Sequence, residues 1–509
     1  MAKTWGFYGR SVETADIRRI VSSGRWFFCA ISGRRRIGKT TLVRRALSEQ
    51  DRMPFFVQIP DSDERGVVQA FRDAVEDFWE VTLGPSPAAE IRTFSDIAGL
   101  IARLNENMGT VVIIDEFQYF NKPALSSFRS FLQAQVDMLR DQRRGGLFVL
   151  GSIHTEMTAI LEDRSSPLFN RLTHKVDVSH WDFQTLFDMF QDQGIDDPRH
   201  QLFLWSLFEG VPKFYRDCFE EGALSPSEDY RVDTLRRLFF EGTSTLRDEA
   251  ENWFLREFSG RYDSVLKILA RHGPCSLGDL KAEYQSADGE GETQLGSYLQ
   301  ILIERYEMIE RLQPMFSGDA SRKTRYAISD NFLSAWLNCI GRNVQIARVQ
   351  PMARPVQRSS ERLFEHEGIV LEKMIRLLTE ECSRKGVGDF FLTDLVRGYW
   401  NKPDGSDIEI DVVALNEDDQ IVRFGSCKRN ASEHNASALK SFEGHLARFR
   451  TTKEGRRLTG WTEQRALYAP LFPPDQRKHL ESLGYICLDL PDFAAALATA
   501  SPAMTNSIH

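Results

Sequence analysis

GRRRIGKT, at residues 33–40, is the stretch that decides the fold, because it matches the phosphate-binding pattern G-x-x-x-x-G-K-[ST] in full. An apolar run at 26–32 precedes it and an amphipathic stretch follows it, which predicts a strand, a loop and a helix in that order. In such a loop, backbone N–H groups surround a phosphate at the helix N-terminus. The residues expected to bind nucleotide here are Gly33, Arg34, Arg35, Arg36, Ile37, Gly38, Lys39, Thr40 and Thr41.

The last residues of the motif have separate chemical roles. Lys39 supplies a positive charge for the β- and γ-phosphate oxygens, and Thr40 offers a hydroxyl to Mg²⁺. The motif therefore predicts ATP and Mg²⁺ as ligands. The structural alternative is a chance match in a tight turn, and the order of strand, loop and helix argues against it.

Four short apolar runs define the sheet that carries this loop. They are WFFCAIS (26–32), PFFVQI (54–59), VVIID (111–115) and LFVLGS (147–152), and amphipathic stretches separate them. Continuous apolar strands alternating with helices predict a parallel sheet covered on both faces. The fold class is therefore α/β for this part of the chain.

An acid pair follows the third of these strands. Asp115 and Glu116 stand at its carboxyl end, the edge at which open α/β sheets bind ligands. We expect Asp115 to hold Mg²⁺ through water and Glu116 to act as the general base on the attacking water. The alternative is an acidic helix cap after an ordinary strand.

Weaker candidates surround these two motifs. Ser152, at the end of its strand, could sense the γ-phosphate, although a serine there is also a common cap. Arg171 is a candidate arginine finger acting across a subunit boundary, and a solvated surface arginine is its alternative. Gly9 and Arg10 lie just before the core, where an adenine pocket could form.

The rest of the chain divides by its pattern of elements. Residues after 181 are helical and rich in aromatics. Three helices and a β-hairpin follow them and predict a winged helix-turn-helix. A proline-containing stretch without acids comes next, and a second α/β region follows it. The expected division is a P-loop core at 1–181, a helical lid at 182–258, a winged helix at 259–345, a linker at 346–360 and an α/β domain at 361–500.

Composition limits the environment and the partners. The chain has seven widely spaced cysteines and no apolar run of membrane-spanning length, so we expect a cytoplasmic protein without a membrane contact. The formal net charge is −9, so any contact with double-stranded DNA must come from local patches. The candidate patches are the wing residues Arg322, Lys323 and Arg325 and the basic cluster at 447–457.

The ordered motifs FYGR, GRRRIGKTTL, VVIIDEFQYF, LGS and PLFNR, with GVPKFY (210–215) and RYAISDNFLSAWL (325–337), resemble the archaeal-type ATPases of the STAND/AAA-related P-loop class. The resemblance covers nearly the whole chain. It implies an ATPase core, a winged helix and then a C-terminal restriction-endonuclease-like domain. It also implies an oligomer or a partner protein.

A nuclease site in that C-terminal domain would need two acids and a lysine around Mg²⁺. The matching residues are Glu372, Glu409, Asp411, Ser426 and Lys428. Ser426 stands where the resemblance calls for a carboxylate, and a neutral oxygen is a weaker ligand for a hard cation. We therefore expect an endonuclease-like fold that cleaves DNA weakly or not at all. The alternatives are a competent nuclease, in which Glu372 or Glu409 replaces the lost ligand, and an unrelated α/β domain.

Two functions from different classes remain open at this point. In the first, the ATPase couples nucleotide state to a DNA-directed, nuclease-like module, as in genome defence or mobile-element control. In the second, the ATPase is a regulatory switch whose nuclease-like domain is catalytically silent and docks a partner. The intact pair Asp115 and Glu116 favours hydrolysis of ATP in both.

Overall fold

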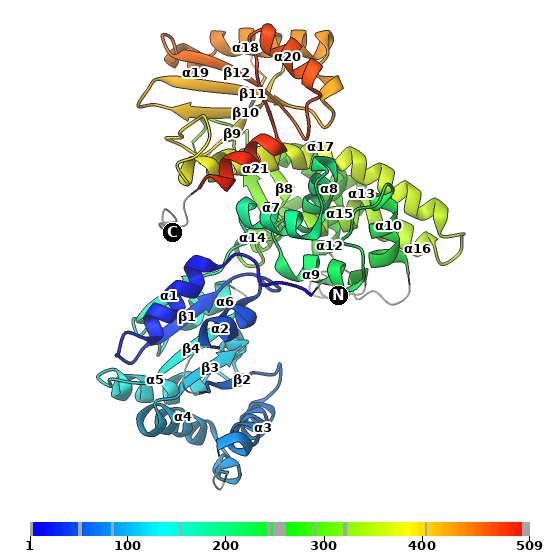
Figure 1. The fold of residues 1–509 in the computed structure, drawn as a ribbon. Coiled ribbons are helices and arrows are strands. Elements are labelled where there is room, and N and C mark those ends of the chain that lie inside the picture. Colours follow the sequence, from blue (N-terminus) through cyan, green and yellow to red (C-terminus); the bar gives the residue numbers. More distant parts are fainter. Residues whose placement is uncertain are drawn as a thin grey trace. The chain divides into compact units, whose positions relative to one another are not determined.

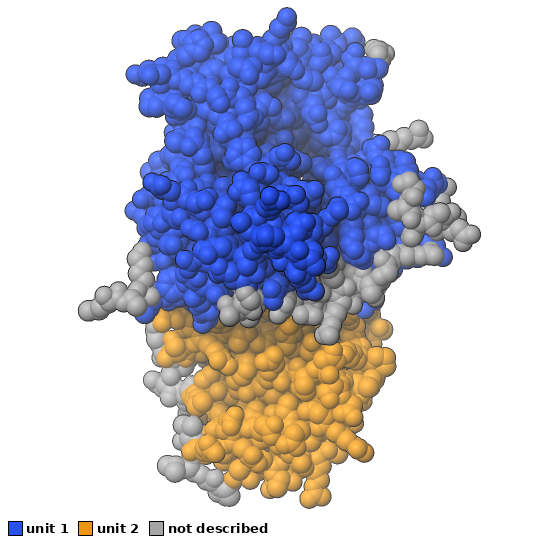
Figure 2. Space-filling view, turned by 90° about the vertical axis from the view of Figure 1, so that its right-hand side faces the viewer, with its two compact units in different colours: residues 1–8, 181–509 blue, residues 9–180 orange. Residues whose placement is uncertain are grey.

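The computed structural model describes residues 4–48, 53–82, 86–152, 154–241, 246–247, 261–288, 292–318, 323–402 and 405–500. The chain forms two compact units, which are coloured separately in Figure 2. One unit comprises residues 9–180, and the other comprises residues 1–8 together with 181–509. The first eight residues thus belong with the second unit, whereas the sequence pattern placed them in the P-loop core.

The unit at 9–180 is built on a five-stranded parallel sheet with the order β2-β3-β4-β1-β5. Its strands are β1 (Phe28–Ser32), β2 (Phe55–Gln58), β3 (Val111–Asp115), β4 (Gly146–Gly151) and β5 (His174–Asp177). The four predicted strands are confirmed, and β5 is an additional edge strand. Because β4 lies between β1 and β3, the phosphate loop and the acid pair follow strands that are not adjacent.

Helices cover both faces of this sheet, as the continuous apolar strands require (Figure 1). They are α1 (Ser11–Val21), α2 (Lys39–Leu47), α3 (Glu64–Thr82), α4 (Phe94–Arg103), α5 (Phe128–Leu139) and α6 (His154–Leu161). Successive strand residues enter opposite cores: Ile113 packs with residues of α1 and α2, and Ile114 packs with residues of α3 to α6. The α/β fold class is therefore confirmed for this unit.

The second unit begins with helices and a small sheet. The helices are α7 (Phe183–Gln193), α8 (Pro198–Phe208), α9 (Pro212–Glu220), α10 (Tyr230–Leu235), α12 (Arg261–His272), α13 (Leu277–Asp288), α14 (Glu292–Glu304), α15 (Asn331–Ala335) and α16 (Gly341–Ile346). Strands β6 (Cys275–Ser276), β7 (Ile309–Leu312) and β8 (Arg325–Ile328) pair in the order β6-β8-β7. Helices α12 to α14 and this sheet have the order of a winged helix. The predicted boundary at 258 lies outside the described residues.

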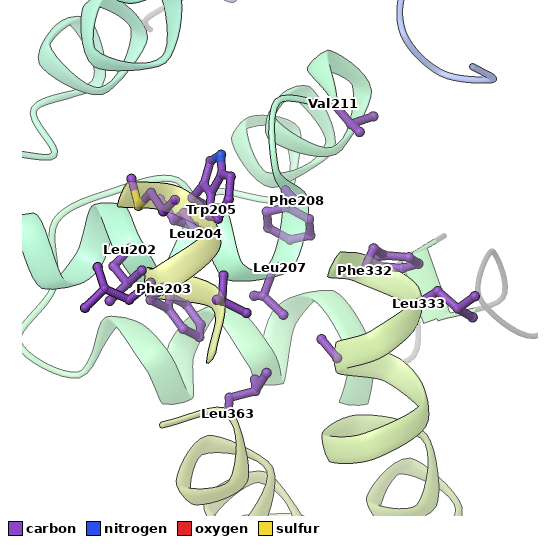
Figure 3. Packing of buried hydrophobic residues seen from close by; sticks show 14 of the residues in the cluster. Leu202, Phe203, Leu204, Trp205, Leu207, Phe208, Val211, Phe332, Leu333 and Leu363 are labelled. Atoms are coloured by element: carbon purple, nitrogen blue, oxygen red, sulfur yellow. The ribbon is translucent and has the colours of Figure 1, made fainter. Parts of the chain in front are cut away.

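Aromatic and aliphatic side chains join the two parts of this helical region. Figure 3 shows Phe208 and Leu207 of α8 beside Phe332 of α15 and Leu363. The rings of Phe208 and Phe332 stack with centroids 6.3 Å apart. The predicted lid and winged helix therefore share one hydrophobic core.

The predicted linker at 346–360 is wrong over most of its length, because the 32-residue helix α17 (Ala353–Arg384) begins inside it. Pro355 lies in the first turn of α17, where a missing backbone N–H removes no hydrogen bond. Val356 and Ser359 are buried, so the first turns pack rather than cross solvent. A proline-containing stretch without acids is typical of a spacer, but burial of its apolar face makes this one a helix.

The C-terminal sheet is mixed and has the order β13-β12-β11-β10-β9. Strands β9 (Arg397–Asn401), β10 (Ile408–Asn416) and β11 (Ile421–Cys427) pair antiparallel, whereas β12 (Thr462–Ala469) and β13 (Ile486–Asp489) continue the sheet in parallel. Helices α18 (Ala436–Thr451), α19 (Lys453–Arg457), α20 (Pro474–Ser482) and α21 (Leu490–Ala498) complete this part. None of the described helices has the length and hydropathy needed to cross a membrane.

Candidate nucleotide site and C-terminal acidic cluster

The loop after β1 has a backbone path that only glycine permits at two points. Gly33 has φ +152°, and a Cβ there would lie 2.3 Å from the carbonyl oxygen of Val178. Gly38 has φ +89° and forms the N-cap of α2. These positions let the backbone of 33–40 curl around the helix N-terminus, which is the geometry that binds a phosphate.

Lys39 lies inside this loop. Its ammonium group donates to the carbonyl oxygens of Gly33, at 2.8 Å, and Arg34, at 3.0 Å. Burial lowers the pKa of Lys39 to about 8, and the nearby carboxylates of Glu116 and Asp115 oppose that shift. A buried cation hydrogen-bonded to neutral carbonyl oxygens suits an anionic ligand, because phosphate oxygens would add negative charge beside it.

Thr40, at the start of α2, and Asp115, at the end of β3, are joined by a hydrogen bond. The Thr40 hydroxyl donates to Asp115 Oδ2 at 2.6 Å, and Asp115 Oδ1 accepts the backbone N–H of Glu116 at 2.9 Å. Both groups offer oxygen ligands, which fit Mg²⁺. No group of three or more His, Cys, Asp or Glu side chains in the described ranges is arranged to hold a metal. Mg²⁺ in nucleotide sites takes few protein ligands and completes its shell with water and phosphate, so two oxygens suffice.

Glu116, Ser152 and Gln118 form a polar cluster where β3 and β4 end. Glu116 has φ +57°, a left-handed conformation uncommon for a non-glycine residue. The Ser152 hydroxyl lies 3.4 Å from Glu116 Oε2, and the Gln118 amide contacts both residues. The sequence reasoning missed Gln118. The sequence feature that could have indicated Gln118 is a polar residue within the aromatic run FQYF, directly after the acid pair.

Arg10 is buried and bonds to the backbone of the phosphate loop. Its guanidinium donates to the carbonyl oxygens of Ser179, at 2.6 Å, and Ile37, at 3.3 Å, and pairs with Glu13 at 2.8 Å. Gly9 precedes it with φ +62°. The adenine contact of Gly9 and Arg10 stays a prediction, and Thr41 is exposed on α2.

Arg171 has a partner within its own unit. Its guanidinium forms two parallel hydrogen bonds to the carboxylate of Asp137 on α5, at 2.8 and 3.0 Å, and a third to the Phe169 carbonyl oxygen. A finger role would require this bidentate pair to open. The geometry therefore favours a structural role over the predicted finger.

The C-terminal acids and lysine converge as the sequence predicted. Asp411 on β10 accepts hydrogen bonds from the Cys427 N–H, at 2.8 Å, and the Ser426 hydroxyl, at 3.4 Å. The pairing of β9 with β10 shifts register between Ile410 and Val413, and such a bulge re-aims a side chain. Burial raises the pKa of Asp411, while Lys428 is near enough to oppose that rise.

Glu372 joins this cluster from α17. Burial and the charge of Asp411 raise the pKa of Glu372 to about 8. Arg376, one turn later, lies 3.7 Å from Glu372 Oε2 and donates to the Asp411 carbonyl oxygen at 3.0 Å. Glu372, Glu409 and Asp411 line one cavity of about 470 Å³. The cluster already holds an arginine as its counter-charge.

Glu409 pairs with one residue of the predicted basic wing, Arg325. Arg325 pairs with Glu409 at 3.0 Å and lies over the ring of Trp400 on β9, 4.7 Å from its centroid. Trp400 Nε1 donates to the Lys323 carbonyl oxygen at 2.7 Å. DNA contact by Arg325 stays a prediction, and it would require this ion pair with a carboxylate distant in the chain to open. Arg322 lies outside the described residues.

The basic cluster at 447–457 is also partly engaged. Arg450 pairs with Glu463 at 2.5 Å, and Arg448 donates to the Asp407 carbonyl oxygen at 3.1 Å. Arg456 and Arg457 are exposed on α19. The part of this cluster that faces solvent is therefore smaller than its sequence suggested.

Two family models match the chain. Residues 7–213 match a family described as an ATPase domain predominantly from Archaea, and residues 336–439 match a family described as archaea bacterial proteins of unknown function. The first match contains the phosphate loop, the acid pair and Ser152. The second contains α17 and β9 to β11, and with them the C-terminal acidic cluster.

Individual proteins are similar at low identity. An uncharacterized protein of Methanocaldococcus jannaschii is 24% identical over 429 residues, which cover 83% of this chain and 87% of that protein. The Walker-type ATPase of Pyrococcus abyssi is 18% identical with a TM-score of 0.46, covering 65% of this chain and 96% of its own. The ORC2 protein of Aeropyrum pernix is 18% identical with a TM-score of 0.45, covering 67% and 94%. Residues 7–213 are thus similar to an archaeal-type ATPase domain and carry a parallel sheet with a phosphate-binding loop, and a C-terminal domain of mixed sheet follows them.

Proposed function

We propose that the chain hydrolyses ATP with Mg²⁺ at the loop of residues 33–40. The observation that carries this proposal is the 2.6 Å hydrogen bond between Thr40 and Asp115. It joins the first residues of α2 to the end of β3, so that two oxygen ligands lie beside the ammonium group of Lys39. That set of one cation and two hard oxygens is what a Mg²⁺–triphosphate needs.

The protein groups divide the work of hydrolysis. The backbone N–H groups of the loop and Lys39 bind and orient the phosphates, and Thr40 and Asp115 would hold Mg²⁺, which supplies charge neutralisation. Glu116 takes the proton of the attacking water as general base. Ser152 contacts the same carboxylate and would sense the γ-phosphate.

The test separates binding from turnover. Lys39→Ala should abolish nucleotide binding, because the buried phosphate charge loses its cation. Glu116→Gln should retain binding and lose about 10²–10⁴-fold in kcat, the usual cost of losing a general base. Glu64→Gln, an exposed carboxylate on α3, is the control and should behave as wild type. Wild-type turnover in Glu116→Gln would show that another group is the base.

For the C-terminal domain, we propose a nuclease-like module coupled to the nucleotide state, with weak or absent cleavage. Ser426 gives the cluster a neutral oxygen where a second carboxylate would strengthen Mg²⁺ binding, and Arg376 lies 3.7 Å from Glu372. Nicking of a supercoiled plasmid, with Mg²⁺ and then Mn²⁺, should be near background in wild type and in Asp411→Ala. Cleavage gained in Ser426→Glu supports the proposal, and robust wild-type cleavage lost in Asp411→Ala contradicts it.

Two biological roles are compatible with such a module. One is a DNA-directed role in genome defence or mobile-element control. The other is a regulatory switch that docks a partner, which the internal pairing of Arg325 with Glu409 favours. Double-stranded DNA should stimulate the ATPase rate in the first role and leave it unchanged in the second. The measurement is turnover with and without a mixed-sequence duplex at fixed salt.

A further inference from the structure

Gln118 lies at the centre of the polar cluster beside the acid pair. It belongs to the short helix at Phe117–Asn121 and is buried, between Phe117 and Phe120, which are also buried. A buried amide needs partners for both its N–H groups and its oxygen, because leaving them unpaired costs free energy. The partners of the Gln118 amide therefore indicate its role in the site.

The partners of Gln118 are the two groups with roles in hydrolysis. Its amide nitrogen donates to Glu116 Oε2 and to the Ser152 hydroxyl, at 3.2 Å, and its amide oxygen accepts the Ser152 N–H at 3.3 Å. The direct contact between Ser152 and Glu116 is longer, at 3.4 Å. One side chain thus ties the end of β3 to the end of β4 through both a donor and an acceptor.

We propose that Gln118 is a positioning residue that couples the general base Glu116 to the γ-phosphate sensor Ser152. When a γ-phosphate oxygen accepts a hydrogen bond from the Ser152 hydroxyl, the Ser152 side chain moves toward the phosphate. The Gln118 amide, which is bonded to both residues, then shifts the Glu116 carboxylate to face the attacking water. The base is then set only when a triphosphate is bound. This inference rests on the ATPase function proposed above.

The first experiment compares Gln118→Ala with Gln69→Ala, an exposed glutamine of α3 that bonds to Asp73 on its own helix. Gln118→Ala should keep the dissociation constant for a non-hydrolysable triphosphate near the wild-type value. Its kcat should fall by about 10- to 100-fold, because a misplaced base loses its alignment with the water. Gln69→Ala should leave both quantities unchanged.

The second experiment uses pH to separate positioning from a structural role. In Gln118→Glu a second carboxylate would touch that of Glu116, and two adjacent carboxylates do not both ionise easily. The acidic limb of the kcat profile should therefore move to higher pH, whereas a purely structural defect would lower kcat equally at every pH.

The outcomes are distinguishable from a failure of the proposed function. If the wild-type protein does not hydrolyse ATP, the ATPase proposal fails and this inference falls with it. If the wild type hydrolyses ATP and Gln118→Ala matches its kcat, only the coupling is refuted. A parallel loss of nucleotide affinity and of melting temperature in Gln118→Ala, with an unshifted pH profile in Gln118→Glu, also refutes it.

Discussion

At the residue scale, the candidate ATPase site brings the positive charge of Lys39 close to the carboxylates of Asp115 and Glu116 without a direct ion pair between them. Lys39 is buried against carbonyl oxygens, and the nearest carboxylates already have donors, since Asp115 accepts from Thr40 and from the Glu116 N–H. Such a site favours a ligand that brings both negative phosphate and a cation. Its dependence on Mg²⁺ should therefore be strict, and a chelator should stop turnover.

Thr40 allows this to be tested without removing the loop. Thr40→Ala should raise the Mg²⁺ concentration for half-maximal ATPase rate by about tenfold or more, because one hard oxygen is lost. Thr40→Ser keeps the hydroxyl and should restore the wild-type requirement. Titrations of ATPase rate against Mg²⁺ measure the difference, and equal requirements in Thr40→Ala and wild type would exclude the hydroxyl as a ligand.

Arg171 and Asp137 give a second prediction at this scale. A partly exposed bidentate pair contributes about 0–1 kcal/mol, so Arg171→Ala and Asp137→Ala should each lower stability slightly and leave ATP turnover unchanged. Turnover with melting curves tests this in both variants. A large loss of turnover in Arg171→Ala alone would restore the arginine-finger role, and ATP-dependent light scattering would then reveal the assembly that such a role requires.

At the element scale, helix α17 holds the second unit together through buried ion pairs. Glu367 pairs with Arg231 of α10 at 2.6 Å and with Arg429, directly after Lys428, at 2.8 Å. Nearer its end, Glu381 accepts from Lys385 at 2.9 Å and from the backbone N–H of Phe183 at 2.7 Å. Helix α17 thus links the helical region to Arg429, the residue after Lys428 in the C-terminal domain.

Glu367→Ala should be strongly destabilising. It would leave two buried guanidinium groups without their carboxylate, which typically costs about 3–5 kcal/mol. Glu361→Ala changes an exposed glutamate of the same helix that accepts a hydrogen bond from Gln357 in its own turn, and it should cost about 0.5 kcal/mol or less. Urea denaturation of both variants measures the contrast, and equal effects would mean that the Glu367 network contributes nothing.

His200 on α8 makes the helical region sensitive to acid. Its ring is buried and stacks on Tyr230 with centroids 4.0 Å apart, and burial lowers the pKa of His200 to about 4 from 6.5. Between these values the unfolded chain binds more protons, so stability falls as pH drops from 6.5 to 4. His200→Phe keeps the stack and should lose about 1–3 kcal/mol of this dependence. Identical melting curves against pH in both proteins would contradict the assignment.

At the scale of the second unit as a whole, the winged-helix sheet is fixed to the C-terminal sheet. Met315 donates its N–H to the Gly398 carbonyl oxygen at 2.8 Å and is buried in the C-terminal core, and Phe316 lies against Tyr399 and Phe449. Arg325 pairs with Glu409 beside these contacts. The segment between β7 and β8 is therefore packed against the C-terminal sheet.

A charge reversal tests this attachment. Arg325→Glu should repel Glu409 and speed amide hydrogen exchange in β8 and β9, while the double variant Arg325→Glu with Glu409→Arg should restore slow exchange. Arg311→Glu, an exposed position of β7, is the control. Unchanged exchange in Arg325→Glu would show that the ion pair does not hold the wing. Loss of DNA binding without a change in exchange would favour the wing as a nucleic-acid contact.

The sequence by itself determined the parts that depend on contiguous residues. The phosphate loop, the four strands around it and the acid pair could all be predicted, because the glycine spacing and the apolar runs are local signals. The proximity of Asp411 to Ser426 was implied by the resemblance to a restriction-endonuclease-like domain, and the two side chains do lie together.

Only the tertiary structure decided the features that need partners distant in the chain. Burial of Val356 and Ser359 makes a predicted linker the start of α17, and Glu409 pairs with Arg325, which lies 84 residues before it in the chain. Gln118 became part of the site because β4 lies beside β3 and brings Ser152 to it. The physical reason is the same in each case: a side chain's role depends on the desolvation and charge of neighbours that local sequence does not specify.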